Sequence, residues 1–276
     1  METLSQSILT KTIRQRPADS YKGTYGRVTL VGGNRNFGGA ILMASAAAVY
    51  AGAGLVTTIT DASNQTSLHA RLPEAMFADM TNHEQMKSLV VSADVVVIGP
   101  GLGTDEAGLM ALNTTFAALK PTQTVIIDGS AITLIAQHNL TLPKAHLIFT
   151  PHQMEWQRLS GIPIADQTVA NNQPAVVKLN ATVIVKSHRT QIYTPTAVYE
   201  NPLGTPAQAT GGMGDTLAGM VGGFVAQFTD HTNAVLAAVY SHSAIAEELA
   251  EKQYVVLPHQ IIDVLPQFMK AHEALV

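Results

Sequence analysis

Residues 27–60 read RVTLVGGNRNFGGAILMASAAAVYAGAGLVTTIT, and this stretch decides the fold. It opens with the apolar run 27–31, passes through a glycine-rich loop into the alanine-rich segment 39–51, and ends in the β-branched run 55–60. A short β-branched run predicts a strand, and a run of Ala, Leu and Met predicts a helix. Strand, helix and strand in this order predict a βαβ unit with parallel strands.

The same alternation continues along the chain. Further strands are predicted at 94–98, 124–128, 146–149 and 182–186, and further helices at 105–119, 131–137, 153–159, 168–179, 215–227, 233–251 and 259–265. Most strand segments are continuous apolar runs, as expected for parallel strands that are covered on both faces. The short runs 190–194 and 197–200 predict an antiparallel meander at one edge.

The pattern therefore predicts an α/β protein with three layers: helices, a mostly parallel central sheet, and helices again. We expect a single domain over residues 1–276, with 1–20 as a polar N-terminal segment. Pro174 would interrupt the helix 168–179, and Pro266 would mark the end of the last helix, because proline removes a helical hydrogen bond.

Composition excludes several classes of protein. With 46% hydrophobic and 13% charged residues, the 276-residue chain is too apolar for a disordered protein and too poor in charge for a long coiled coil. The absence of cysteine excludes disulfides, thiolate nucleophiles and cysteine-held metals, and it fits a cytoplasmic protein. A net charge of -4 predicts no nucleic-acid partner, because no basic footprint is present. A small molecule is the expected ligand.

A membrane location is not expected. The uncharged stretch 36–60 is long enough to cross a bilayer, but Gly52 and Gly54 divide it into a helix and a strand. Residues 1–21 contain no apolar segment of the kind that a signal peptide requires. Gly219, Gly222 and Gly223 predict the close packing of a buried helix.

Glycine-rich loops follow several of the predicted strands or open helices. They read GGNRNFGGA at 32–40, GPGLG at 99–103 and TGGMGD at 210–215, and the sequence TPH follows a further strand at 150–152. Ligands of open α/β sheets bind beyond the carboxyl ends of the strands, and a helix start attracts phosphate. The spacings match neither a dinucleotide-binding fingerprint nor a P-loop, so a Rossmann dehydrogenase and a Walker-type ATPase are not indicated.

Asp215 and His152 are the candidate chemical groups in these loops. A carboxylate beside an anion-binding helix start can accept a proton from an attacking hydroxyl, but Asp215 could equally be a helix N-cap. His152 and Glu155 would lie near one face of a helix. No dense spacing of metal ligands occurs, so we expect no protein-held metal, and any Mg²⁺ would be carried by phosphates.

The same motifs carry a family resemblance. GMGD at 212–215 resembles the Gly-x-Gly-Asp signature of ribokinase-like proteins, in which Asp is the base and the preceding amides form an anion hole. The set GPGLG, TPHxxE and ATGGMGD resembles the ADP-dependent NAD(P)H-hydrate dehydratases, from about Tyr21 to the C-terminal helices. The resemblance implies a ribokinase-like fold. It also implies ADP-dependent dehydration of the S epimer of NADHX or NADPHX, with release of AMP and phosphate.

The resemblance also implies roles for individual residues. It places Ala40, Gly103, His152 and Asp215 against the hydrated nicotinamide nucleotide, places Lys186, Ser187, His188, Arg189, Thr190 and Gly214 against the adenine nucleotide, and forms the anion hole from Gly212, Met213 and Gly214. Asp215 would be the catalytic base. Mg²⁺ accompanying ADP and a homo-oligomer, often a tetramer, are implied as well.

The chain departs from the family pattern at two places. Ser187 stands where the family usually has glycine, and Asn34 and Phe37 stand where serine and tyrosine are common. Two other functions share the same motifs: a vitamin-precursor kinase of the ribokinase-like superfamily, and a non-catalytic nucleotide-binding module. The sequence leaves open the choice between ADP and ATP, and between NADHX and NADPHX.

Overall fold

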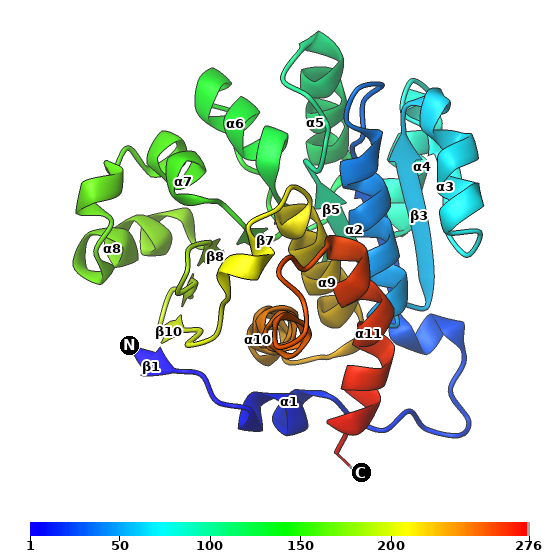
Figure 1. The fold of residues 1–276 in the computed structure, drawn as a ribbon. Coiled ribbons are helices and arrows are strands. Elements are labelled where there is room, and N and C mark those ends of the chain that lie inside the picture. Colours follow the sequence, from blue (N-terminus) through cyan, green and yellow to red (C-terminus); the bar gives the residue numbers. More distant parts are fainter. Residues whose placement is uncertain (275–276) are drawn as a thin grey trace.

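The computed structural model describes residues 1–274 and contains a ten-stranded sheet in the order β1-β10-β9-β8-β7-β6-β5-β2-β3-β4 (Figure 1). The strands are β1 (Glu2–Thr3), β2 (Arg27–Val31), β3 (Leu55–Thr60), β4 (Met76–Asp79), β5 (Val95–Ile98), β6 (Thr124–Ile127), β7 (His146–Phe149), β8 (Thr182–Val185), β9 (Gln191–Tyr193) and β10 (Val198–Glu200). All neighbouring strands pair in parallel except at β9, which is antiparallel to both β8 and β10. The mostly parallel sheet with an antiparallel edge is confirmed, and β1 extends that edge by pairing in parallel with β10.

Helices cover both faces of this sheet. They are α1 (Ser7–Thr12), α2 (Gly38–Tyr50), α3 (Gln65–Arg71), α4 (His83–Ser92), α5 (Glu106–Ala118), α6 (Gly129–His138), α7 (Gln153–Ser160), α8 (Val169–Leu179), α9 (Met213–Gln227), α10 (His231–Ala250) and α11 (Pro258–Ala271). Buried residues of α2, α9, α10 and α11 form one hydrophobic cluster, and those of α4, α5, α6 and α8 form a second on the other face. The predicted three-layer arrangement is confirmed.

Successive residues of each central strand enter opposite clusters. In β5, Val95 and Val97 belong to the cluster that contains α9, while Val96 and Ile98 belong to the cluster that contains α5. This alternation follows from the pleat of a strand, which turns neighbouring side chains to opposite faces. All four side chains are buried, and this double burial explains why the strand reads as a continuous apolar run.

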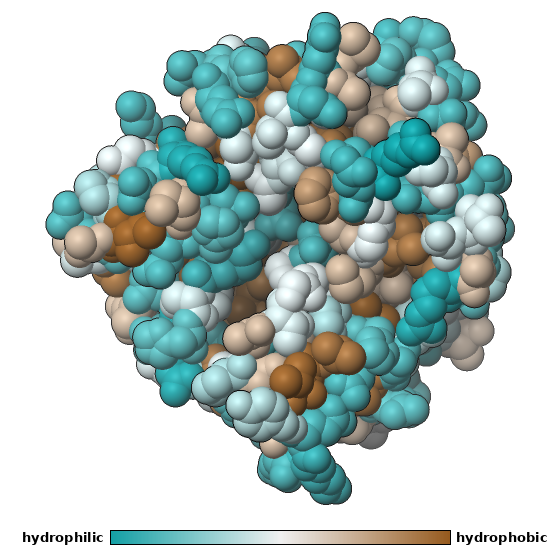
Figure 2. Space-filling view, turned by 45° about the horizontal axis from the view of Figure 1, so that its top comes forward, coloured by the Kyte–Doolittle hydropathy of each residue, from teal (hydrophilic) through white to brown (hydrophobic). Residues whose placement is uncertain are grey.

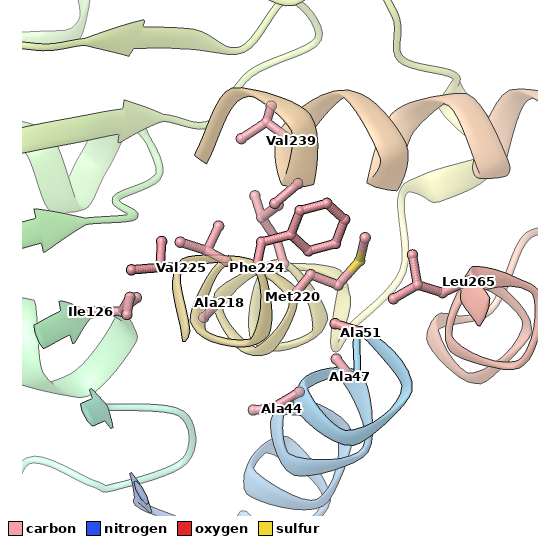
Figure 3. Close-up of a cluster of buried hydrophobic side chains, with 14 of the residues drawn as sticks. Ala44, Ala47, Ala51, Ile126, Ala218, Met220, Phe224, Val225, Val239 and Leu265 are labelled. Atoms are coloured by element: carbon pink, nitrogen blue, oxygen red, sulfur yellow. The ribbon is translucent and has the colours of Figure 1, made fainter. Parts of the chain in front are cut away.

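Helix α9 is the central helix of its layer. Figure 3 shows its side chains Met220 and Phe224 between α2, α10 and α11. A Cβ added to Gly219 would lie 2.0 Å from the carbonyl oxygen of Ala44 in α2, so only glycine allows the two helices to approach this closely. The predicted close packing at these glycines is confirmed, and it fixes the position of the α9 N-terminus.

The two prolines that were expected to interrupt or end a helix lie inside helices. Pro266 lies inside α11 rather than at its end, and Pro174 lies inside an uninterrupted α8. In α11 the buried side chains of Leu265 and Phe268 lie on either side of Pro266, so packing against the core maintains the helix across the missing hydrogen bond.

Residues 1–20 are also more than a polar segment. Leu4, Ile8, Leu9 and Ile13 are buried in the same cluster as α10, and α1 packs against that helix. Among residues 1–274, no helix combines the length and the apolar character that a bilayer crossing needs.

Candidate active site

The loops that follow the parallel strands meet at one edge of the sheet, as predicted. The amide of Gly33, after β2, donates to the carbonyl of Pro100, after β5, at 2.8 Å. The amide of Lys186, after β8, donates to the carbonyl of Pro151, after β7, also at 2.8 Å. Figure 2, which turns the upper part of Figure 1 toward the reader, shows a face hollowed near its centre and surrounded mainly by hydrophilic residues.

The N-terminus of α9 is open to a ligand. The helix begins at Met213, two residues earlier than predicted, and its N-cap is Gly212, in a left-handed conformation with φ of 96°. No side chain caps the first-turn amides, so the positive end of the helix dipole is available to an anion. Asp215 lies in this first turn and is not the N-cap, so the N-cap interpretation of that residue was wrong.

A lysine side chain reaches the same helix start. The Nζ atom of Lys186 lies 3.0 Å from the point where a Cβ on Gly214 would be, while a Cβ on Gly211 would meet open space. Burial alone would lower the pKa of Lys186, but the carboxylates of Asp128 and Glu155 raise it above its ordinary value. A permanent positive charge therefore lies beside the uncapped amides of α9.

Asp128 holds this lysine in place. Lys186 Nζ donates to Asp128 Oδ1 at 2.9 Å, and Thr150 Oγ1 donates to the same oxygen at 2.7 Å. The side chain of Asp128 is only 3% exposed, so its charge is stabilised by these donors rather than by water. Asp128 was not among the predicted site residues. Its only signal was an acidic residue directly after an apolar strand.

The carboxyl group of Asp215 has the properties of a base that works near neutral pH. Burial and the nearby negative charge of Asp128 raise the pKa of Asp215 to about 6, against an opposing effect of Lys186. A general base is most effective when its pKa lies close to the working pH. Asp215 is therefore the strongest candidate for the group that removes a proton at this site.

His152 and Glu155 form a reciprocal cap at the start of α7. The Nδ1 atom of His152 accepts from the amide of Glu155 at 3.3 Å, and Glu155 Oε2 accepts from the amide of His152 at 2.8 Å. The predicted proximity of the two side chains is confirmed. The His152 side chain remains 52% exposed, and its backbone is paired with that of Lys186. The cap thus leaves part of the His152 imidazole accessible next to Lys186.

Ala40 lies in the first turn of α2, and Gly103 lies in the loop between β5 and α5. A Cβ on Gly101 would be 3.0 Å from the Cβ of Ala40, and one on Gly103 would be 2.5 Å from Asn34 Nδ2. Met43, one turn after Ala40 in α2, contacts Gly212: a Cβ there would lie 2.5 Å from the Met43 sulfur. The first two turns of α2 therefore connect the predicted hydrate-binding residues to the α9 N-terminus.

Residues Ser187 to Thr190 form the turn between β8 and β9. Ser187 Oγ donates to the carbonyl of Arg189 at 2.7 Å and accepts from the Arg189 amide at 3.2 Å. Ser187 is not among the residues with positive φ, so this chain does not need the backbone freedom of the glycine that the family usually has. The hydroxyl instead closes the turn.

The structure also bears on metal binding and on cavities. Within residues 1–274, His, Asp and Glu side chains form no cluster of three that could hold a metal ion. A cavity of about 880 Å³ lies at the C-terminal ends of α2 and α9, lined by Arg16, Tyr25 and Gln227 among others. It is at the opposite end of α9 from Asp215, so the candidate site rests on its chemistry and not on this cavity.

These features define a class of protein. A mostly parallel sheet between two helical layers, with an uncapped glycine-rich helix start and an acidic first turn, is the arrangement of a ribokinase-like α/β protein. Comparison with known proteins narrows the class. The chain belongs to the NAD(P)H-hydrate dehydratase family, whose model matches residues 28–267.

Individual relatives agree with this assignment. The ADP-dependent (S)-NAD(P)H-hydrate dehydratase of Lactiplantibacillus plantarum is 57% identical over 269 residues, which cover 98% of this chain and 97% of the relative. The crystal structure of a ribokinase-like superfamily protein from Enterococcus faecalis matches with a TM-score of 0.97 at 49% identity, covering 99% and 96% of the two chains. An ADP/ATP-dependent NAD(P)H-hydrate dehydratase from Bacillus subtilis, co-crystallised with ATP and Mg²⁺, matches with a TM-score of 0.87 at 29% identity, covering 99% of both chains. The family resemblance seen in the sequence is confirmed.

Proposed function

We propose that this protein is an ADP-dependent hydro-lyase that converts the S epimer of hydrated NADH or NADPH back to the reduced coenzyme. The observation that carries the proposal is the position of Asp215, a carboxyl with a pKa of about 6 in the first turn of an uncapped helix. Relatives named for this activity span nearly the whole chain, which supports the substrate class.

The chemistry requires activation of a poor leaving group. Hydroxide does not readily leave C6 of the hydrated nicotinamide ring. Asp215 removes the proton of that hydroxyl while the oxygen attacks the terminal phosphorus of ADP, and AMP departs. The C6–O bond of the phosphate ester then breaks, phosphate leaves with the electron pair, and a proton is lost from the neighbouring carbon. NADHX and ADP thus give NADH, AMP and phosphate.

The remaining residues of the site bind and orient. The amides of Gly212, Met213 and Gly214, together with the helix dipole, hold the transferring phosphoryl group, and Lys186 adds a fixed positive charge beside it. Ala40, Gly103 and His152 line the hydrate. Ser187, His188, Arg189 and Thr190, in the turn after Lys186, contact the adenine nucleotide.

Magnesium fits this site only as a companion of the nucleotide. Asp128 is bonded to Lys186 and Thr150, and Glu155 caps α7, so the carboxylates nearest Asp215 already have partners. The phosphates and water would supply most ligands of the ion, which neutralises charge on the transferring group. A homotetramer and a cytoplasmic location complete the proposal: the tetramer rests on the family resemblance, and the cytoplasmic location on the absence of cysteine.

The test is an assay of coenzyme recovery. Purified protein is mixed with a hydrate preparation, Mg²⁺ and either ADP or ATP, and the absorbance of the reduced nicotinamide is followed together with free phosphate. We expect both to rise with ADP. Asp215→Asn should lower the rate by about 10²- to 10⁴-fold, the usual effect of losing a general base.

The same assay separates the alternatives. Accumulation of a stable phosphorylated product with no recovery of absorbance would identify a kinase of the same superfamily. Nucleotide binding without turnover of either hydrate would identify a binding module. An Asp215→Asn variant with full activity would remove the base assignment while leaving the hydro-lyase assignment intact.

A further inference from the structure

A buried histidine lies behind the turn that leads into α9. His242, on α10, is 6% exposed and packs beneath the 3-10 helix Pro206–Gln208. Its Nδ1 atom lies 3.4 Å from Gln208 Nε2. The Gln208 amide has a defined orientation, because its Oε1 accepts from the amide of Thr205 at 3.3 Å. The amide nitrogen of Gln208 therefore faces the ring and donates to it.

This contact determines the state of the imidazole. A ring that accepts at Nδ1 carries its proton on Nε2 when it is neutral. Burial and the positive charge of Lys186 lower the pKa of His242 to about 4, and only the backbone of Met213 acts in the opposite direction. The ring is therefore neutral at physiological pH. Its Nε2 atom is enclosed and has no partner within hydrogen-bond distance among residues 1–274, although the backbone of Met213 lies near the ring.

The turn above the ring has few contacts of its own: the amide of Ala209 donates to the carbonyl of Pro206 at 3.0 Å, and Met43 packs against Gly212 at its far end. Residues 209–212 connect Gln208 to Met213, and a Cβ at Gly211 would meet open space. Within the turn, the amide of Thr210 bonds only to the carbonyl of Gln208, at 2.7 Å. The ring of His242 contacts Gln208 at one end of this turn and lies close enough to Met213, at the other end, for its backbone to influence the ring's pKa.

We propose that His242 is a positioning residue for phosphoryl transfer: wedged between Gln208 and Met213, its neutral ring holds the 209–213 turn so that the first amides of α9 point at the terminal phosphate. This inference rests on the proposed anion hole at 212–214. His242 does not touch the substrate, because its free nitrogen is sealed from solvent. It acts through the turn, and nothing in the sequence motifs indicated it.

Variants of His242 and Gln208 distinguish the effect of the ring's shape from the effect of its hydrogen bond. His242→Phe keeps a ring of similar volume but removes both nitrogens. His242→Asn removes much of the ring but places an amide oxygen near the position of Nδ1, where it can still accept from Gln208. Gln208→Met, on the other side of the contact, removes the donor with little change in side-chain length and leaves α10 untouched.

The experiment compares nucleotides with and without the terminal phosphate. The affinities of ADP and AMP, each with Mg²⁺, are measured by calorimetry on the full chain, together with kcat and KM for ADP. We expect His242→Phe to weaken ADP binding and to lower kcat by about 10- to 100-fold, as for a misplaced catalytic group, and to change AMP affinity less than twofold. Gln208→Met should also weaken ADP binding and lower kcat. His242→Asn should retain most of the ADP affinity and most of the kcat that His242→Phe loses.

Two results would overturn the inference. One is an equal loss of ADP and AMP affinity in His242→Phe and Gln208→Met. The other is a lower melting temperature with unchanged nucleotide affinities and an unchanged kcat, which would make the histidine purely structural. Should His242→Phe fail to fold, Gln208→Met decides alone.

A separate control tests the anion hole itself. Gly214→Ala places a methyl group against Lys186 Nζ at the phosphate position. If this variant leaves the ratio of ADP to AMP affinity unchanged, the proposed anion hole fails, whatever the His242 variants show. If the ratio falls in Gly214→Ala but not in the His242 and Gln208 variants, only the inference about His242 fails.

Discussion

Asp215 is subject to opposing electrostatic influences. Burial and Asp128 favour its neutral form, while Lys186 favours the ionised form, and the balance raises its pKa to about 6. A fully solvated aspartate would be a weaker base, and one buried without Lys186 would stay protonated at neutral pH. The lysine and the buried aspartate are thus as important to the proposed reaction as the base itself.

This balance predicts the pH dependence of the reaction. Asp215 must be ionised to accept a proton, so kcat/KM should be constant above pH 7 and fall about tenfold for each pH unit below 6. Initial rates of coenzyme recovery between pH 5 and 8 test this. Asp128→Asn should shift the acidic limb to lower pH, because it removes the negative charge that raises the pKa. An acidic limb of kcat/KM centred near pH 4 in the wild type would contradict the assignment of Asp215 as the base.

The same shift has a consequence for stability. Because the pKa is about 6 in the folded chain and 3.8 in its reference state, the folded protein binds the extra proton between these values. Stability contributed by this group is therefore lost as pH rises from about 4 to 6. The ionised carboxyl destabilises the fold by at most about 3 kcal/mol above pH 7.

Asp215→Asn should therefore be more stable than the wild type at neutral pH. The gain should reach at most about 3 kcal/mol at pH 7.5 and should shrink toward zero near pH 4. Urea unfolding at the two pH values measures it. A gain that is the same at both pH values would show that the substitution acts through packing and not through the charge.

At the scale of elements, the crossing of α2 and α9 controls the site. The two helices touch through glycine and alanine, with Gly219 against the backbone of Ala44 and Gly223 against Ala48 and Ala51. Small residues on both sides bring the axes close together, and this places Met43 of α2 against Gly212 at the start of α9. The shape of the proposed anion site thus depends on a contact two turns away from it.

This crossing predicts opposite effects for two glycine substitutions. Gly219→Ala should destabilise the protein by about 1–3 kcal/mol, because its Cβ would meet the Ala44 carbonyl and force the helices apart. Gly39→Ala, at an exposed position of α2 with nothing within 4 Å of the added carbon, should stabilise by about 0.5–1 kcal/mol. Thermal unfolding of both variants checks this. Equal changes in stability in the two variants would mean that helix propensity, and not packing, determines the effect of Gly219→Ala.

Central elements could be predicted from the sequence because double burial makes their strands apolar throughout. The edge was harder to predict. Residues 61–93 received no assignment, although they contain β4 and α4. Strand β4 pairs only with β3, and Met76 at its start is 46% exposed, so it has no continuous apolar run to reveal it. The extent of α11 was missed because packing overrides the local effect of Pro266.

The candidate site shows the same division. Glycine loops and Asp215 could be predicted because local sequence encodes the turn and the helix start. The bond between Asp128 and Lys186 could not, since it joins residues that are 58 positions apart through the adjacency of β6, β7 and β8. His242 could not be predicted for a related reason. Its proposed role depends on where α10 packs, and no local sequence pattern encodes that position.

At the scale of the whole molecule, the N-terminal arm, residues 1–20, packs against the core. Its helix α1 packs on α10, and Leu9 is fully buried although the surrounding sequence is polar. Arg16 continues this contact by donating to the carbonyl of Gly52, at the end of α2, and to Gln227, at the end of α9. The arm thus connects α2 and α9, the two helices that form the proposed anion site.

Leu9→Ala should therefore destabilise the protein without altering its chemistry. The loss of a buried leucine costs about 2–5 kcal/mol, and α1 lies far in the fold from the strand-end loops, so KM and kcat should not change. Lys11→Ala, on the exposed side of the same helix, should stay within about 0.5 kcal/mol of the wild type. Chemical denaturation measures both. A Leu9→Ala protein of unchanged stability would mean that the arm is detached in solution.

The pairing of β1 with β10 also orders events during synthesis. Glu2 pairs with Tyr199, so β1 leaves the ribosome long before its partner strand. Until β10 has emerged, β1 has no partner, and the apolar face of the arm stays uncovered until α10 follows. Such a contact of long sequence separation slows folding, because the intervening chain must be ordered first. Until it docks, the nascent arm therefore stays accessible to chaperones and proteases.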